Sequence, residues 1–151
     1  MKYFLFILVL AVGLFSCDFK SPKEDSESVS VLLVEEVLEK HPDGSVKAIE
    51  EFEMVDGVKK IYGYKEFYPS GKVKIEGRYN VNNQREGLWQ AFYENGNKWS
   101  IGTYVDGEEN GEKKVGFKNG KLRYTGQMKK NKPTGEWHIW NELGEESTKI
   151  F

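Results

Sequence analysis

Glycines recur at a nearly constant interval along this chain, and that periodicity limits its fold more than any other feature. Five of them follow short polar runs typical of turns, at intervals of 27, 25, 24 and 24 residues: Gly44, Gly71, Gly96, Gly120 and Gly144. A second and a third set repeat with them: Gly77, Gly102 and Gly126, then Gly87, Gly111 and Gly135. Self-similarity at a fixed period indicates a repeat architecture, in which each unit packs on its neighbours.

Each unit is predicted to be a β-hairpin. The dipeptides Asn95-Gly96 and Asn119-Gly120 suit the two-residue type I′ turn, whose central residues both need positive φ. Asp43-Gly44 suits the same turn, whereas Leu143-Gly144 does not. We therefore expect regular hairpins through most of the chain and an irregular or frayed one at its end.

Two-residue turns would also fix which residues face each other across the hairpins. They predict three cross-strand pairs: Trp89 with Gly102, Tyr64 with Gly77, and Lys113 with Gly126. An aromatic ring laid over a facing glycine restores the packing that the glycine lacks, while the glycine lets the strand bend. We expect this arrangement in the first two pairs, but not in the third, where the partner is a lysine.

Alternation along the strands separates an aromatic face from a polar face. The polar face carries mostly lysine, arginine, glutamate and glutamine, and five apolar residues fall on it as exceptions: Phe67, Phe92, Trp99, Ile101 and Trp140. An isolated hairpin is marginal in water, so the units must pair edge to edge. The predicted fold is all-β, an elongated single-sheet antiparallel meander of hairpin repeats of about 24 residues. Residues 29–40 are valine-rich, which favours a first strand over a short helix.

The N-terminal residues 1–16 are predicted to be a signal peptide. A cationic start precedes an apolar run that is shorter than the roughly 20 residues of a membrane span. The sequence LFSC then resembles a bacterial lipobox, in which Cys17 would become the lipidated first residue. An ordinary signal peptide with an incidental cysteine is the alternative. Cys17 is the only cysteine in the sequence, so it has no partner for an internal disulfide.

Residues 17–28 are predicted to be the lipidated N-terminus and a flexible tether, because they are polar, charged and lack apolar periodicity. The repeat domain would then span residues 29–151. Charge is unevenly distributed along the chain: residues 18–57 hold 12 acidic and 4 basic side chains, whereas residues 112–135 hold 1 acidic and 8 basic.

The repeat resembles the MORN repeat in its bacterial variant, the antitoxin-like MORN repeat family. The resemblance rests on YENGNKWSIGTYVDGEENG and, more loosely, on YPSGKVKIEGRYNVNNQREGLW, and it covers roughly residues 60–140. It implies an elongated antiparallel sheet that acts as a scaffold or binding surface. The chain departs from the pattern at Lys113 and Gly116, where aromatic residues are usual, and at Glu50, which replaces a repeat glycine.

No catalytic constellation is present in the sequence, so we expect no enzyme activity, no metal and no cofactor. The two histidines, His41 and His138, stand in different units, and neither has a nearby His or Cys with ligand spacing. No serine lies in a nucleophile-elbow context, and no glycine-rich loop precedes a helix.

The aromatic face is the first candidate for an interaction surface. Its rings either bury one another or pack against residues 29–57, or they remain open to a partner, since a single sheet has no second layer to cover them. The candidate residues are Tyr64, Tyr68, Trp89, Tyr93, Tyr104, Phe117, Tyr124 and Trp137.

A basic patch is the second candidate. Such a run is either a solvated surface or a site for anionic lipid, acidic polysaccharide or an acidic segment of another copy. Its residues are Lys113, Lys114, Lys118, Lys121, Arg123, Lys129, Lys130 and Lys132.

These features favour a lipid-anchored, non-catalytic module that binds another envelope protein, with its aromatic side chains as anchors. We expect it to be exported and held by its lipid at the cell envelope, with the outer membrane favoured and the domain facing the periplasm or the surface. One alternative is a carbohydrate or envelope-ligand module, in which tyrosine and tryptophan stack on sugars. Another is an antitoxin or immunity role, which rests on family analogy alone. Nucleic acid is not an expected partner.

Overall fold

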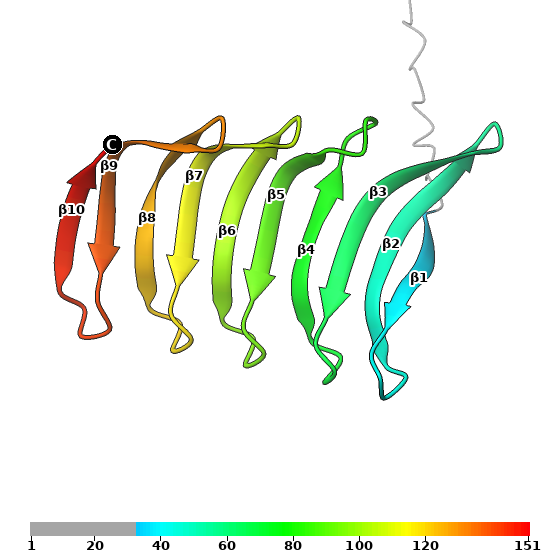
Figure 1. Ribbon diagram of the computed structural model, residues 1–151, viewed down its shortest axis with the longest axis horizontal. Coiled ribbons are helices and arrows are strands. Elements are labelled where there is room, and N and C mark those ends of the chain that lie inside the picture. The colour runs from blue at the N-terminus through cyan, green and yellow to red at the C-terminus, as the bar shows by residue number, and fades with distance from the viewer. Residues whose placement is uncertain (1–32) are drawn as a thin grey trace, which may run out of the picture. The chain divides into compact units, whose positions relative to one another are not determined.

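The computed structural model describes residues 33–151. They form one open antiparallel sheet whose strands follow chain order, so the expected all-β meander is confirmed (Figure 1). The strands are β1 (Val34–Lys40), β2 (Val46–Val55), β3 (Val58–Phe67), β4 (Val73–Tyr79), β5 (Arg85–Phe92), β6 (Lys98–Val105), β7 (Glu108–Gly116), β8 (Leu122–Lys129), β9 (Lys132–Trp140) and β10 (Glu146–Ile150). The strand predicted within residues 29–40 is β1. The predicted signal peptide, the lipidated Cys17 and the tether lie outside the described residues.

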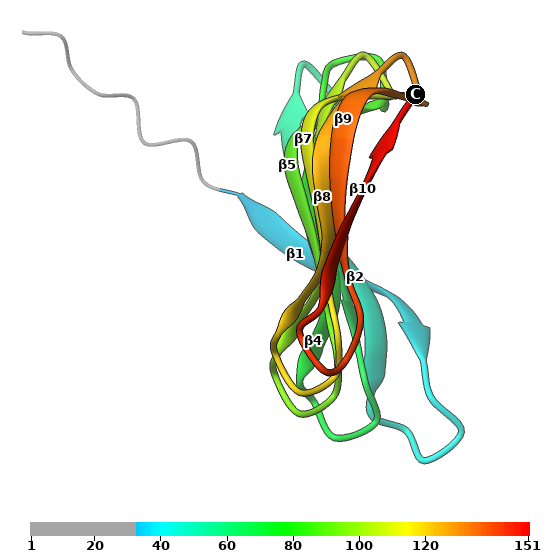
Figure 2. The same cartoon turned by 90° about the vertical axis from the view of Figure 1, so that its left-hand side faces the viewer.

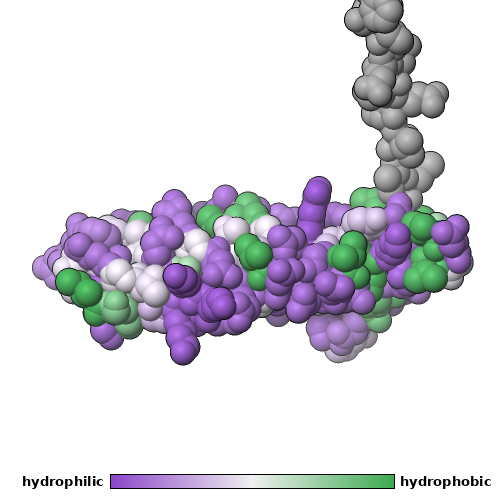
Figure 3. Space-filling view, turned by 90° about the horizontal axis from the view of Figure 1, so that it is seen from above, coloured by the Kyte–Doolittle hydropathy of each residue, from purple (hydrophilic) through white to green (hydrophobic). Residues whose placement is uncertain are grey.

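The sheet is a single layer, as the edge-on view shows (Figure 2). Within residues 33–151 neither face is covered by a second layer, so few side chains are buried. The buried apolar residues are Ala48, Ile49, Trp89, Ala91, Val115 and Trp137. Seen along one rim, most of the surface is hydrophilic, with separate hydrophobic patches along the sheet (Figure 3). Stability of this sheet has to come from packing between neighbouring strands, since no second layer formed by residues 33–151 covers either face.

The five repeat turns share one geometry, which differs from the predicted type I′. In the turn of FYENGNK, the Gly96 N–H donates to the Tyr93 carbonyl and the Tyr93 N–H donates to the Asn97 carbonyl, both at 2.8 Å. Gly96 has φ +90°, whereas Asn95 does not have positive φ. This is a type I turn followed by a left-handed glycine. Asn95 serves it differently from the prediction, because its side-chain oxygen accepts the Asn97 N–H at 3.1 Å.

The first and last units adopt the same turn. The Gly44 N–H donates to the His41 carbonyl, and the Gly144 N–H donates to the Asn141 carbonyl. The expected irregularity at Leu143-Gly144 is therefore wrong. The type I turn needs a left-handed residue only at the glycine, so the poor fit of Leu143 to a type I′ turn does not matter.

The predicted register is nevertheless correct, because two departures cancel. The turn holds three residues instead of two, which shifts the pairing by one and sets Phe92 opposite Lys98. A β-bulge at Trp99 then shifts it back, so Ala91 faces Ser100 and Trp89 faces Gly102. The pairs Tyr64 with Gly77 and Lys113 with Gly126 are also as predicted.

The same bulge corrects the predicted position of Trp99. Simple alternation places Trp99 on the polar face, but the extra residue brings it to the aromatic face, where it lines a cavity with Ile75 and Trp89. Its ring lies 6.4 Å from that of Tyr93. Three other hairpins have a β-bulge at the corresponding place, and the bulged residues are Lys47, Lys74 and Arg123.

Two-residue turns do occur, but on the opposite rim of the sheet. Asp56-Gly57, Asp106-Gly107 and Lys130-Asn131 have positive φ at both positions and directly join paired strands. They connect one repeat unit to the next. Type I′ turns match the right-handed twist of the strands, which accounts for their use in these tight connections.

A chain of hydrogen bonds links the repeat turns across unit boundaries. The Tyr68 hydroxyl donates to the Phe92 carbonyl at 2.8 Å, and the Tyr93 hydroxyl donates to the Gly116 carbonyl at 3.0 Å. His41 Nε2 makes the equivalent contact with the Phe67 carbonyl at 3.0 Å. The next residue in this series is Phe117, which has no hydroxyl to donate. These bonds hold each turn against the following hairpin.

Candidate binding groove

Trp89 is the centre of the larger aromatic cluster. Only 4% of it is exposed, although it belongs to a single-layer sheet. Its indole lies directly on the backbone of Gly77 in the preceding strand, where a Cβ would overlap the ring. Its Nε1 donates to the Arg78 carbonyl at 3.0 Å. The prediction that Trp89 covers Gly102 is therefore wrong, because Trp89 faces Gly102 in register but turns its ring to the strand on the other side.

Three tyrosines and one arginine enclose Trp89. The rings of Tyr79, Tyr104 and Tyr64 lie 5.3, 6.3 and 6.4 Å from it. The Arg85 guanidinium stacks on the indole at 4.1 Å, which completes the cover on the solvent side. Burial raises the pKa of Tyr79 above its usual value, although the nearby charge of Arg85 opposes this effect. Burial likewise raises the pKa of Tyr64.

Trp137 repeats this packing farther along the sheet. It is 7% exposed, and its indole covers the backbone of Gly126. The rings of Tyr124 and Phe151 flank it at 5.8 and 5.7 Å. Its Nε1 is buried and has no hydrogen-bond partner among the described residues, in contrast to Trp89.

The unit between the two clusters has an ion pair in place of the indole. Lys113 Nζ lies 2.6 Å from Glu109 Oε1, and the two side chains are 18% and 11% exposed. These groups cover Gly102, since a Cβ there would meet the Glu109 carboxylate and lie 3.4 Å from Lys113 Nζ. A glycine covered by indole in two units is therefore covered by two charged side chains in this one.

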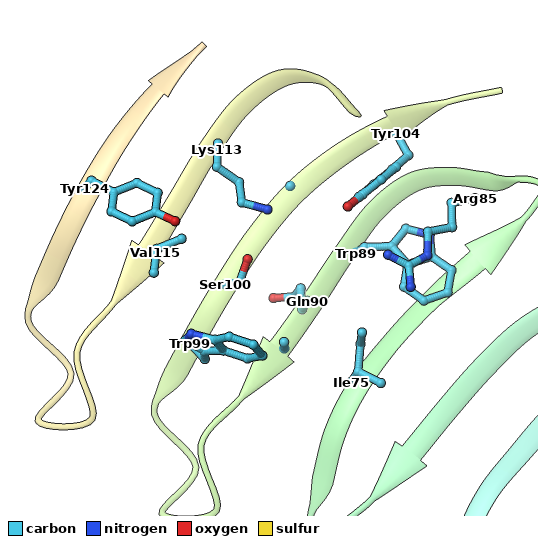
Figure 4. A pocket seen from close by; sticks show the side chains of 12 residues that line it. Ile75, Arg85, Trp89, Gln90, Trp99, Ser100, Tyr104, Lys113, Val115 and Tyr124 are labelled. Atoms are coloured by element: carbon cyan, nitrogen blue, oxygen red, sulfur yellow. The ribbon is translucent and has the colours of Figure 1, made fainter. Parts of the chain in front are cut away.

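A cavity opens beside this ion pair, between the two aromatic clusters (Figure 4). Its volume is about 270 Å³, and its walls include Trp89, Trp99, Tyr104, Lys113 and Tyr124. A second cavity of about 410 Å³ shares Lys113 and Tyr124 with it and extends to Trp137 and Phe151. We call these two adjoining cavities the groove. Its lining combines aromatic rings with a few polar groups, as ligand sites generally do.

The structure divides the predicted aromatic face into parts with different roles. Trp89 and Trp137 are core residues, and their surroundings are formed by Tyr64, Tyr104 and Tyr124. The other three, Tyr68, Tyr93 and Phe117, belong to the repeat turns at one rim. The rings thus cover one another to a large extent, while the groove leaves the ring of Trp99 exposed beside half-buried Tyr104 and Tyr124.

The eight residues of the predicted basic patch do not form one cluster. Lys113 lies in the groove, whereas Lys114 pairs with Glu112 on the other face at 2.7 Å. Lys118 and Lys121 belong to a repeat turn, and Arg123 is a bulged residue whose guanidinium lies 5.7 Å from the Phe117 ring. The last three are at the opposite rim: Lys129, Lys130 and Lys132.

Arg85, Glu109 and Trp99 are among the groove residues that sequence reasoning missed. The bulge that brings Trp99 to this face leaves no clear signal in the sequence. Arg85 and Glu109 could have been found from the repeat, because each stands four residues before the position that holds Trp89 or Lys113. Residues four apart in an irregular strand are not obvious neighbours, so the spacing acquires meaning only with the structure.

Other site types find no support in the described part of the chain. Within residues 33–151 no three His, Cys, Asp or Glu side chains are grouped as metal ligands. The same residues include no helix with the length and apolar character of a membrane span.

Two segments of the chain are similar to a known repeat family. Residues 64–80 and 85–106 match the family model described as MORN repeat variant, and they take in parts of β3 to β6. No curated protein matches the chain. The crystal structure of the GtfA/B complex bound to UDP and GlcNAc is similar over 73% of this chain, at 11% identity and a TM-score of 0.33. The chain covers 21% of that structure's chain.

Proposed function

We propose that this chain, which matches the MORN repeat variant over residues 64–80 and 85–106, is a non-catalytic interaction scaffold at the bacterial cell envelope. In this proposal the groove holds a segment of another envelope protein, and the lipid on Cys17 anchors the scaffold to the membrane. The rigid strands of the sheet present the groove, while the tether of residues 17–28 sets its distance from the membrane.

The groove is the observation that carries this proposal. Most rings of the aromatic face are covered by their neighbours, but the groove keeps Trp99 48% exposed beside half-buried Tyr104 and Tyr124. Exposed apolar surface of this kind marks a site of association. Aromatic side chains supply much of the binding energy in protein interfaces, because they bury a large area at a low cost in conformational entropy.

The anchor is supported by the sequence around Cys17. The residues LFSC follow an apolar run of signal-peptide length, and a polar segment separates them from the first strand. Replacing Cys17 with serine should move the protein from the membrane fraction to the soluble fraction. Retention of the Cys17→Ser protein in the membrane fraction would exclude lipid attachment at this position.

Site-specific photo-crosslinking tests the interaction itself. A photoreactive amino acid at Ser100 lies in the groove, and the same amino acid at Thr103 lies on the opposite face of the same strand. We expect Ser100 to capture a defined envelope protein in intact cells and Thr103 not to capture it. Equal capture from both positions, or none from Ser100, would contradict a role for the groove in protein binding.

A carbohydrate ligand is the second candidate, because Trp99 offers an exposed ring at the edge of the groove on which a sugar could stack. The polar rim of the groove, with Ser100 and Lys113, suits the hydroxyls of a sugar. A glycan array distinguishes the two candidates. Selective glycan binding that disappears in a Trp99→Ala protein would favour this second function.

A further inference from the structure

The groove coincides with a change in the repeat itself. Positions 89, 113 and 137 are equivalent in the 24-residue repeat, and they hold Trp89, Lys113 and Trp137. The residue four positions earlier differs between the units as well: it is Arg85, Glu109 and Pro133 in turn. In the preceding unit, Arg85 stacks on Trp89, while here Glu109 pairs with Lys113. One unit has therefore exchanged a stacked Arg–Trp pair for an ion pair.

A second change in this region enlarges the space. Ser100 occupies the repeat position that holds Ile75 in the preceding unit and Tyr124 in the following one. All three residues line the 270 Å³ cavity, and Ser100 is the smallest of them. The cavity therefore lies beside the ion pair that replaces an indole, where Ser100 also replaces a larger side chain, next to the ring of Trp89.

The charge of the cavity is not balanced within the described residues. Lys113 is paired with Glu109, but no carboxylate of residues 33–151 lies within 4.0 Å of the Arg85 guanidinium. Arg85 is half-buried, lines the cavity and is held in place by the rings of Trp89 and Tyr104, at 4.1 and 5.4 Å. A fixed and partly desolvated guanidinium is a strong donor to a carboxylate.

From these observations we propose that the cavity binds an aromatic side chain of an acidic partner segment. The ring enters the space that the ion pair and Ser100 leave open beside Trp89, and a neighbouring carboxylate of the same segment pairs with Arg85. This inference rests on the proposed function, since it names the class of protein segment that the groove accepts.

Three short peptides test the inference with the full-length protein. The probes are the amidated, acetylated tripeptides Glu-Phe-Glu, Lys-Phe-Lys and Glu-Ala-Glu, titrated by calorimetry or by NMR. We expect Glu-Phe-Glu to bind at least about tenfold more tightly than either of the others, because only it offers both the ring and the carboxylate. An Arg85→Gln protein should lose about the same factor for Glu-Phe-Glu.

A repeat-restoring variant provides the decisive comparison. Glu109→Arg with Lys113→Trp copies the Arg85–Trp89 pair of the preceding unit into this one, so it should fill the cavity and abolish binding despite its added positive charge. The matched control is Glu112→Arg with Lys114→Trp, which replaces the ion pair on the opposite face of the same strand. This control should bind Glu-Phe-Glu as the wild type does. Circular dichroism checks that both variants remain folded.

The outcomes separate this inference from the proposed function. Equal affinity for all three peptides, or undiminished binding by the folded repeat-restoring variant, would overturn the inference. Capture of a protein from Ser100 in intact cells would then still support the scaffold function with another kind of segment. Tight binding of Glu-Phe-Glu without any capture from Ser100 would support the cavity chemistry and contradict the proposed function.

Discussion

The indole of Trp89 covers Gly77 on β4, whereas the Gly102 that faces Trp89 in register lies on β6, on the other side of its strand. The ring thus joins two repeat units, because Gly77 belongs to the hairpin before its own. Trp137 does the same with Gly126. In a sheet without a second layer, this contact is the main way to bury a large apolar surface between units, and the glycine is what makes the close approach possible.

Alanine substitutions at two glycines test this relationship. A Cβ at Gly77 would overlap the ring of Trp89, which is fixed on all sides, so Gly77→Ala should lower the free energy of unfolding by about 1–3 kcal/mol. A Cβ at Gly102 would meet the end of the flexible Glu109 side chain, so Gly102→Ala should cost less than about 1 kcal/mol. Urea unfolding measures both. A larger loss at Gly102 than at Gly77 would mean that Trp89 packs elsewhere.

Substitutions of two tryptophans should differ sharply in their effect on stability, because one is buried and the other is exposed. Trp89 is 4% exposed and Trp99 is 48% exposed. Trp89→Ala should therefore cost about 3–5 kcal/mol, which is a large part of the stability of a small domain. Trp99→Ala should cost less than about 1 kcal/mol. Chemical denaturation at low temperature keeps both proteins measurable, and similar losses would contradict the assignment of Trp89 to the core and Trp99 to the groove.

The hydrogen bonds between repeat turns can be removed in one unit and added in another. Tyr93→Phe removes the bond to the Gly116 carbonyl and should lower the free energy of unfolding by about 1 kcal/mol. Phe117 stands at the same place in the next unit, so Phe117→Tyr should add such a bond and stabilise the protein by about 0.5–1 kcal/mol. Thermal unfolding compares them with wild type. A destabilised Phe117→Tyr protein would show that the chain of bonds cannot be extended.

Burial of Tyr79 predicts a late phase in the alkaline titration. Its pKa is raised in the folded state, so the stabilisation that depends on its neutral form is complete below the usual tyrosine pKa of about 10. That stabilisation is lost as the pH rises through the raised pKa of the folded state. The absorbance of phenolate should show a fraction that titrates later than free tyrosine. Tyr79→Phe should reduce this fraction. Part of the fraction should remain, because the pKa of Tyr64 is also raised.

The fold was largely predictable from sequence, because glycine spacing and strand alternation both depend on local backbone geometry. The period, the meander and the pairing of Trp89 with Gly102 follow from them. The turn type did not follow, since Asn95-Gly96 suits both a two-residue and a three-residue turn. The register survived this error only because the bulge at Trp99 compensates for the longer turn.

The groove was less predictable, because it depends on side-chain direction. The predicted register places Trp89 opposite Gly102, but only the structure shows that the ring turns toward Gly77. The sequence did show a lysine, Lys113, at a repeat position that usually holds an aromatic residue. Its consequence, an ion pair with Glu109 beside a cavity, required knowing that residues four apart along β7 meet on one face.

Photo-crosslinking in two backgrounds shows whether the groove receives a partner segment beside the ion pair of Glu109 and Lys113. A photoreactive amino acid at Ser100 is placed in the wild type and in the folded Glu109→Arg/Lys113→Trp protein. We predict that the wild type captures a defined envelope protein and that the repeat-restoring variant does not. Capture of the same protein with the same efficiency in both backgrounds would contradict binding of a partner segment in the groove.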